Sequence, residues 1–216
     1  MSFLSSIMDL FFPNKCVFCR RMRDGGASIC SKCAENLPYT RNGGRETGEF
    51  FDFCISPLYY KDTVRDSIIR YKFGGAANYA DTYGKLLADC IRENPDVKYD
   101  IISWVPLSGR RKRSRGYDQA MLLALATALE LDDVAAETLK KPKDVTAQTE
   151  IQGGAEARRA NISGAYEAAD PELITDKRVL LIDDVFTTGS TLSECARTLL
   201  MAGAESVVCA ALARGE

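Results

Sequence analysis

The sequence contains no histidine. Histidine is the commonest general base and the usual partner of a catalytic serine or cysteine, so Ser-His and Cys-His nucleophiles are excluded. Metal sites that mix cysteine with histidine are excluded for the same reason. Any chemistry of this chain therefore depends on carboxylates, hydroxyl groups, lysines or a bound metal ion.

Two kinds of apolar segment are also missing. No apolar run approaches the length of a transmembrane helix, so we expect no membrane insertion. The first residues, MSFLSSIMDLFF, lack a basic leading region and a small-residue cleavage site, and they predict a short amphipathic helix that stops before Pro13 instead of a signal peptide. Without a secretion signal, the eight cysteines favour a reducing, cytoplasmic location.

The 216 residues are 46% hydrophobic and 27% charged, which is typical of a globular protein with one core and a small appendage. The net charge of -2 says little about partners, because residues 110–115, RRKRSR, hold five bases in six positions. Residues 1–48 contain four of the cysteines and end in a Gly-rich polar linker, RNGGRETGE. We therefore predict an amino-terminal module over residues 1–48 and a larger domain over residues 49–216.

The larger domain shows alternating strand and helix patterns. Strands are predicted over residues 53–60, 99–106, 178–185 and 206–213, and helices over residues 61–73, 79–94, 117–131 and 191–204. This alternation predicts an α/β fold with an open parallel sheet flanked by helices on both faces. Ligands of such sheets bind at the carboxyl ends of the strands.

Four amino-terminal cysteines form two CxxC pairs, Cys16-x2-Cys19 and Cys30-x2-Cys33. Each pair can present two thiolates to one tetrahedral ion, which predicts a structural Zn²⁺ with four cysteine ligands. The alternatives are four unrelated buried thiols, or two disulfides in an oxidising compartment. The remaining cysteines lie singly in strand or helix patterns and are expected in the core: Cys54, Cys90, Cys195 and Cys209.

The stretch VLLIDDVFTTGST, residues 179–191, places two carboxylates after an apolar strand. Neighbouring strand residues point to opposite faces, so Asp183 and Asp184 share one ligand only if the strand ends there and the chain turns. Gly189 permits a tight turn, the surrounding residues offer hydroxyl groups, and the following helix begins with a dipole that favours an anion. The pattern predicts a ribose 5-phosphate site, with the phosphate in the loop and the ribose hydroxyls on the acids.

A nucleoside triphosphatase is the competing interpretation, in which LLIDD is a Walker-B strand. It requires a G-x4-G-K-[ST] loop earlier in the chain, and the sequence has none, since Gly84-Lys85 is followed by Leu86. A plain surface turn explains the strand but not the two acids and the hydroxyl-rich loop.

The same stretch resembles the phosphoribosyl-pyrophosphate (PRPP) motif of type I phosphoribosyltransferases. The resemblance implies that the acids contact the ribose hydroxyls, that residues 187–191 hold the 5-phosphate, and that Mg²⁺ bridges pyrophosphate and ribose. The PRPP-binding residues implied in this way are Asp183, Asp184, Val185, Phe186, Thr187, Thr188, Gly189, Ser190 and Thr191.

A basic segment, VPLSGRRKRSRGYDQA, follows the predicted strand at residues 99–106. It is expected as a loop at the same sheet edge as the acidic pair. Its arginines suit pyrophosphate oxygens, which they can bind bidentately, and they suit the phosphates of single-stranded nucleic acid equally well. A solvated basic turn is the third interpretation.

The combination of the cysteine module, a Pro-Leu turn, spaced arginines, RGYDQA and the PRPP loop resembles the ComF family of competence-protein phosphoribosyltransferase-like proteins. YKFGG (71–75) fits the family pattern, as do four positions in residues 148–167: Gln148, Arg158, Asn161 and Gly164. The resemblance implies a pyrophosphate loop of Pro106, Leu107 and Ser108, and a mobile basic segment with Arg111, Arg113 and Arg115.

The chain departs from the family at two dipeptides. Ser108-Gly109 replaces His-Pro, which removes an imidazole, and Tyr117-Asp118 replaces Phe-Asn. The carboxylate of Asp118 is expected to repel pyrophosphate unless an arginine neutralises it.

Two functions follow from the resemblance. The first is a PRPP-dependent phosphoribosyltransferase linked to DNA uptake and natural transformation, with no acceptor or general base assigned. The second is a non-catalytic, PRPP-sensing adaptor that binds single-stranded DNA, a DNA-uptake helicase or another competence protein.

Overall fold

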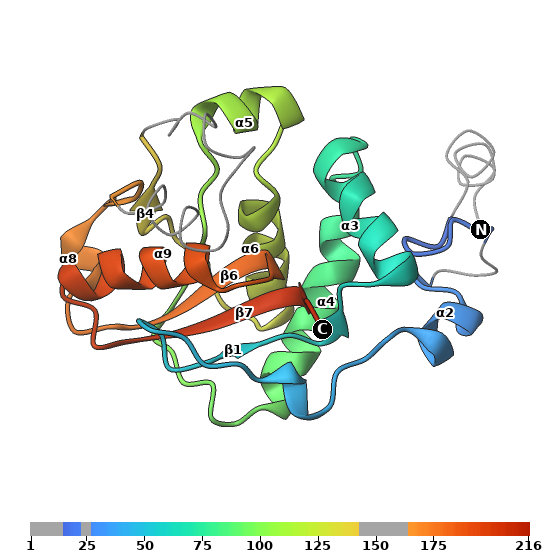
Figure 1. The fold of residues 1–216 in the computed structure, drawn as a ribbon, viewed down its shortest axis with the longest axis horizontal. Helices are drawn as coiled ribbons and strands as arrows, with labels where there is room; N and C mark the ends of the chain where they lie inside the picture. The colour runs from blue at the N-terminus through green and yellow to red at the C-terminus, as the bar shows by residue number, and fades with distance from the viewer. Residues whose placement is uncertain (1–14, 23–26, 143–163) are drawn as a thin grey trace.

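A computed structural model describes residues 15–22, 27–142 and 164–216 (Figure 1). The helix expected before Pro13 and the family positions Gln148, Arg158 and Asn161 lie outside these residues. Within the described ranges, no helix is long and apolar enough to cross a membrane.

A parallel sheet forms the centre of the fold. β7 (Ser206–Arg214) and β6 (Arg178–Phe186) lie side by side, and β3 (Ile101–Trp104) pairs with the other edge of β6. Two short strands, β1 (Cys54–Ile55) and β2 (Leu58–Tyr59), pair with the outer edge of β7. All these pairs are parallel, and Trp104 pairs with Ile182, so β3 and β6 end at the same edge of the sheet.

Helices cover both faces of this sheet, as predicted. α3 (Asp62–Phe73), α4 (Tyr79–Glu93) and α6 (Gln119–Glu130) share one apolar cluster with Leu180 and Ile182 of β6. α9 (Ser190–Met201) and the short α8 (Pro171–Ile174) pack against Val179 and Leu181 on the opposite face (Figure 1). Alternate residues of β6 thus belong to different clusters, and all four of residues 179–182 are fully buried. Burial on both faces explains why the strand is one continuous apolar run in the sequence.

The expected strand over residues 53–60 is divided by Pro57, which has no backbone N–H to donate. The expected polar linker, residues 41–49, is ordered along the outer edge of the sheet. Glu46 and Cys54 exchange two backbone hydrogen bonds of 2.9 and 2.7 Å, and the η1 turn (Asn42–Gly44) precedes this contact. The linker prediction was therefore wrong, because the segment satisfies backbone groups of an otherwise unpaired edge strand.

The amino-terminal residues pack on the helical layer. Val17 and Phe18 are buried in the same apolar cluster as α3 and α4, and the rings of Phe18 and Tyr83 lie 6.0 Å apart. α2 (Ser31–Asn36) follows Cys30 and places Cys33 toward this cluster. The cysteine-bearing segment thus shares its apolar core with the larger part of the chain.

Two further elements border the sheet edge at which β3 and β6 end. α5 (Gly109–Arg115) follows β3, and a small antiparallel pair forms from β4 (Leu139–Lys140) and β5 (Glu167–Ala168). Both lie above the sheet in the view of Figure 1.

Candidate functional site

A cavity of about 290 Å³ opens at the carboxyl ends of β3 and β6. Pro106 and Leu107 line it from the turn after β3, and Val185 lines it from β6. The position agrees with the expected location of a ligand in an open parallel sheet.

Both acids of β6 line this cavity, although the strand does not end at them. β6 continues to Phe186, so the expected turn at the acids was wrong. Asp184 is 8% exposed and forms a 2.7 Å ion pair with Lys72, while Asp183 accepts a 2.8 Å hydrogen bond from the Asp184 backbone N–H. Burial raises the pKa of Asp183, and the adjacent charge of Asp184 raises it further. The cavity thus holds one carboxylate paired with a lysine and a second whose charged form is disfavoured by burial and by its neighbour.

Four cationic side chains surround these acids: Lys72, Arg111, Arg115 and Lys141. Arg115 Nη1 donates a 2.7 Å hydrogen bond to Gln119 Oε1, and burial lowers the pKa of Arg115. Lys141 Nζ donates to the Tyr166 hydroxyl at 3.0 Å. The cavity therefore combines two carboxylates with an excess of cations.

Sequence reasoning missed several of these lining residues. Lys72 lies in YKFGG, which carried a family resemblance but no assigned role, so the motif was a usable signal. Gln119 lies in RGYDQA in the same way. Lys141 directly follows β4 and Tyr166 directly precedes β5. Tyr166 lies in residues 148–167, which carried a family resemblance but no role for this residue, whereas no spacing or motif in the sequence pointed to Lys141.

The predicted phosphate loop faces two hollows. Thr187 and Thr191 line the main cavity, whereas Thr188, Gly189 and Ser190 line a neighbouring cavity of about 340 Å³. Gly189 has φ 72°, and a Cβ there would lie 3.0 Å from the ring of Phe186, so glycine is required. Phe186 is buried and packs edge-to-face on Phe51. The buried ring thus fixes the turn that leads from β6 into α9.

The basic segment is a helix instead of the expected mobile loop. The Ser108 hydroxyl accepts from the Arg111 N–H at 3.5 Å and caps the start of α5, and Gly116 (φ 84°) ends it. Arg111 and Arg115 are four residues apart and line the cavity together, as one helix face requires. Arg113 is exposed and does not line the cavity.

Asp118 has a different role from the one expected. It is 3% exposed; its Oδ1 accepts from the Met121 N–H at 3.2 Å and caps α6, and its Oδ2 accepts from the Leu107 N–H at 2.9 Å. Asp118 does not line the main cavity. Both carboxylate oxygens are thus used by backbone donors, and the effect of the Asp118 charge on pyrophosphate stays a prediction.

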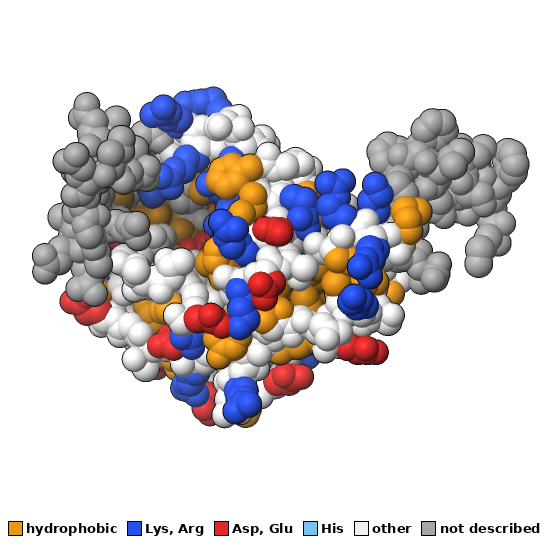
Figure 2. Space-filling view, turned by 45° about the vertical axis from the view of Figure 1, so that its right-hand side comes forward, with side chains coloured by type: hydrophobic (Ala, Val, Ile, Leu, Met, Phe, Trp, Pro, Cys, Tyr) orange, Lys and Arg blue, Asp and Glu red, His pale blue; other side chains and the backbone are white. Residues whose placement is uncertain are grey.

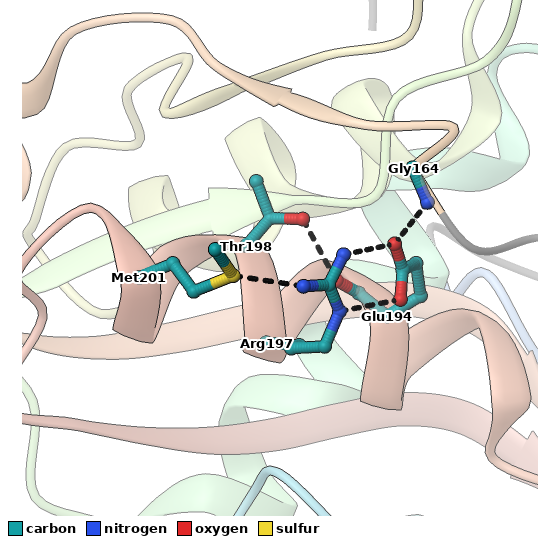
Figure 3. A network of polar contacts seen from close by, with 5 residues as sticks. All are labelled: Gly164, Glu194, Arg197, Thr198 and Met201. Carbon is teal, nitrogen blue, oxygen red and sulfur yellow. Dashed lines mark hydrogen bonds and ion pairs between the residues drawn. The ribbon is translucent and has the colours of Figure 1, made fainter.

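Gly164, a position that fits the family pattern, is held to α9. Its N–H donates a 2.6 Å hydrogen bond to Glu194, which also pairs with Arg197 at 2.7 Å (Figure 3). The Arg197 partner lowers the pKa of Glu194. This network joins the start of the β5 segment to the helix that follows the phosphate loop.

The four amino-terminal cysteines converge as predicted. Their sulfur atoms lie within 4.8 Å of one another, with Cys19 and Cys30 at 3.6 Å. Zn–S bonds of about 2.3 Å in a tetrahedron place sulfurs roughly 3.8 Å apart, so this set fits Zn²⁺. The Cys30 N–H also points at the Cys16 sulfur, at 3.5 Å. The other four cysteines are buried in the core, as expected.

Comparison with known proteins agrees with both parts of the chain. The profile of the phosphoribosyl transferase domain matches residues 114–216, and that of the double zinc ribbon domain matches residues 7–51. Competence protein F of Haemophilus influenzae is 29% identical over 94% of this chain and 98% of its own length. DNA utilization protein YhgH of Escherichia coli O157:H7 is 33% identical over 89% of this chain and 86% of its own.

Among solved structures, a glutamine PRPP amidotransferase from B. subtilis, complexed with ADP and GMP, matches with a TM-score of 0.43 and 20% identity. The match covers 65% of this chain, which spans only 30% of that enzyme. The relatives that align over nearly their whole length, together with the cysteine cluster and the phosphoribosyl transferase profile, show that this chain belongs to the ComF family.

Proposed function

We propose that the cavity at the ends of β3 and β6 binds PRPP, or another ribose 5-phosphate, together with Mg²⁺. The observation that carries the proposal is the arrangement of charge in one cavity, where two β6 carboxylates lie among four cations and the hydroxyls of Thr187 and Thr191. Ribose hydroxyls are donors that carboxylates accept, and phosphate oxygens are acceptors that arginine, lysine and hydroxyl groups satisfy.

In this proposal Asp183 and Asp184 accept from the ribose 2- and 3-hydroxyls. The 5-phosphate lies at residues 187–191, against the first turn of α9, whose backbone N–H groups and dipole favour an anion. Val185 and Phe186 shape the approach to that turn. The pyrophosphate lies at Pro106, Leu107 and Ser108, facing Arg111 and Arg115 of α5.

Magnesium would enter with the ligand. Asp184 is already paired with Lys72, so it attracts a metal ion less strongly than an unpaired carboxylate would. Mg²⁺ keeps several waters and binds through substrate phosphates more readily than through an all-protein cage. Its charge beside Asp183 would also relieve the burial and the neighbouring negative charge that raise the pKa of this acid.

Phosphoribosyl transfer is the activity that this geometry supports best. Pyrophosphate would leave C1 of PRPP as a nucleophile attacks, and the α5 arginines with Mg²⁺ would stabilise the charge that develops on the leaving group. The names competence protein F and DNA utilization protein lead us to propose that the activity serves DNA uptake and natural transformation. We further propose that residues 1–48 form the zinc-binding unit and residues 49–216 the catalytic one.

The test is calorimetric titration of PRPP with Mg²⁺, followed by a pyrophosphate-release assay with a panel of bases and amines. Arg115→Gln should weaken PRPP binding about tenfold or more, since it removes a cation that lines the cavity. Arg113→Gln is the matched control on the same helix and should bind as the wild type does. Absence of PRPP binding by the wild type would refute the proposal, and binding without pyrophosphate release would leave only the sensing role.

A second function, the PRPP-sensing adaptor, is favoured by the outer face of α5. Arg110 and Arg113 are exposed, and Arg113 does not line the cavity. Figure 2 shows further Lys and Arg side chains spread over the upper half of the same face of the molecule. We propose that this surface contacts single-stranded DNA or a helicase partner. An Arg110→Gln/Arg113→Gln variant should bind single-stranded DNA more weakly, with a shallower salt dependence, and retain PRPP binding.

A further inference from the structure

Arg70 holds the loop between the first two zinc-ligating cysteines. Its Nη2 donates to the backbone carbonyls of Val17 at 2.9 Å and Phe18 at 2.7 Å. The Ser67 hydroxyl, one turn earlier in α3, also donates to the Val17 carbonyl. Arg70 Nε is buried without a hydrogen-bond partner among the described residues. The guanidinium is therefore committed to the cysteine loop.

The next two residues of α3 connect this turn to the start of α6 and to the ligand cavity, which Lys72 lines. The Tyr71 hydroxyl donates to the Gln119 carbonyl at 2.8 Å, and the Tyr71 carbonyl accepts from the Tyr117 hydroxyl. Lys72 forms the 2.7 Å ion pair with Asp184. Consecutive helical residues project in directions about 100° apart, so a single turn can contact three separate parts of the molecule. The last turn of α3 thus joins the cysteine cluster, the start of α6 and the acidic strand.

We propose that Arg70 is a positioning residue that couples zinc binding to ligand binding in the cavity. Zinc held by Cys16 and Cys19 would fix the loop between them, whose Val17 and Phe18 carbonyls accept from Arg70. The helix turn held in this way places Lys72 on Asp184 and Tyr71 on α6. Without zinc the loop and this turn would be less well fixed, and the Lys72–Asp184 pair would be weakened. The inference rests on the proposed function, since it takes PRPP with Mg²⁺ as the ligand.

Coupling of this kind is reciprocal, because each ligand must change the affinity of the other by the same factor. The first experiment measures the Kd of PRPP with Mg²⁺ for the zinc-loaded protein and after treatment with a zinc-selective chelator. We expect about a tenfold loss of affinity in the wild type, within the usual range of coupling between sites. The Arg70→Met variant should bind PRPP weakly even when zinc-loaded, and its Kd should change less than about twofold on zinc removal. The control, Arg65→Met at an exposed position of the same helix, should behave as the wild type does.

The second experiment starts from the zinc-loaded protein, so it can also be carried out on variants that do not fold without the metal. The folded, zinc-loaded protein is titrated with a chromophoric zinc chelator, with and without saturating PRPP and Mg²⁺. PRPP should raise the chelator concentration required for half-transfer about tenfold in the wild type and in Arg65→Met, but not in Arg70→Met. Arg70→Lys, which keeps one donor group for the loop carbonyls, should recover part of the effect.

The outcomes separate this inference from the proposed function. PRPP binding that is independent of zinc, or full coupling in Arg70→Met, would overturn the role of Arg70 and leave the PRPP site standing. A zinc-loaded wild type that does not bind PRPP would overturn both.

Discussion

Asp118→Ala tests whether a buried carboxylate sets the shape of the proposed pyrophosphate loop. The side chain joins two elements, since it caps α6 through Met121 and fixes the turn after β3 through Leu107. Alanine removes both acceptors at a site that is 3% exposed, where water does not easily replace them.

The size of the effect follows from these two bonds. Loss of an N-cap typically destabilises a protein by about 1 kcal/mol. A hydrogen bond to a charged acceptor contributes about 1.5–3 kcal/mol, and its loss also leaves the Leu107 N–H without that partner. We therefore expect Asp118→Ala to lower the free energy of unfolding by about 2–4 kcal/mol. For a chain of this size, that corresponds to a fall in Tm of roughly 5–15 °C.

The control is Asp118→Asn, which restores the residue of the family pattern. An amide keeps one acceptor oxygen and presents an NH₂ group to the other backbone donor, so the expected loss is about 1–2 kcal/mol. Thermal unfolding gives the stability of both variants, and calorimetry gives their PRPP affinity. Both should bind PRPP no more tightly than the wild type, since the loop that faces the ligand is less well fixed.

A different result would support electrostatic repulsion in place of positioning. If Asp118→Asn binds PRPP more tightly than the wild type while its Tm is unchanged, the carboxylate acts on the ligand through its charge. The reasoning from the two backbone hydrogen bonds would then be refuted.

Three further perturbations have clear expected outcomes. Asp183→Asn should abolish PRPP binding yet stabilise the ligand-free protein. The raised pKa of this acid means that the folded state favours its protonated form. The stability of the wild type relative to the variant should therefore fall as the pH rises above the ordinary pKa of a carboxyl group, about 4. Denaturant unfolding at several pH values would show or disprove this trend. Lys72→Met leaves the mostly buried Asp184 without its cation and should lower the free energy of unfolding by about 1–3 kcal/mol. Lys85→Met in α4, which does not line the cavity, should be neutral in the same unfolding assay. Cys16→Ser should abolish stoichiometric zinc, measured by metal analysis, and lower Tm, because metal binding stabilises the folded loop; unchanged zinc content would contradict the four-thiolate site.

The sheet and its helices were predictable because their signals are local. Continuous apolar runs such as residues 179–182 indicate buried parallel strands, and the period of residues 79–94 indicates a helix that covers them. The cysteine pairs were predictable for the same reason, since two CxxC spacings each fix two ligands. The acids of β6 were singled out because they follow an apolar strand and precede a hydroxyl-rich loop, a pattern that the family motif also contains.

The parts that were missed depend on tertiary contacts. RRKRSR has no apolar periodicity, so nothing local predicts a helix; α5 forms because Ser108 caps its start and Gly116 ends it. The role of Asp118 was misjudged because sequence places it near the arginines without showing which backbone donors occupy its oxygens. Lys72 lies 112 residues before Asp184 in the numbering, and only the packing of α3 brings them together.

The balance of charge in the cavity distinguishes among ribose phosphates. Four cationic and two anionic side chains line it, and the Lys72–Asp184 pair cancels one of each. The lining thus carries more cationic than anionic side chains, as a phosphate-bearing ligand requires. A pyrophosphate group would add further negative charge close to Asp183, whose pKa is already raised by burial and by the adjacent charge of Asp184. A divalent ion at that position would offset both, and for this reason we propose PRPP with Mg²⁺ as the ligand in preference to a free ribose 5-phosphate.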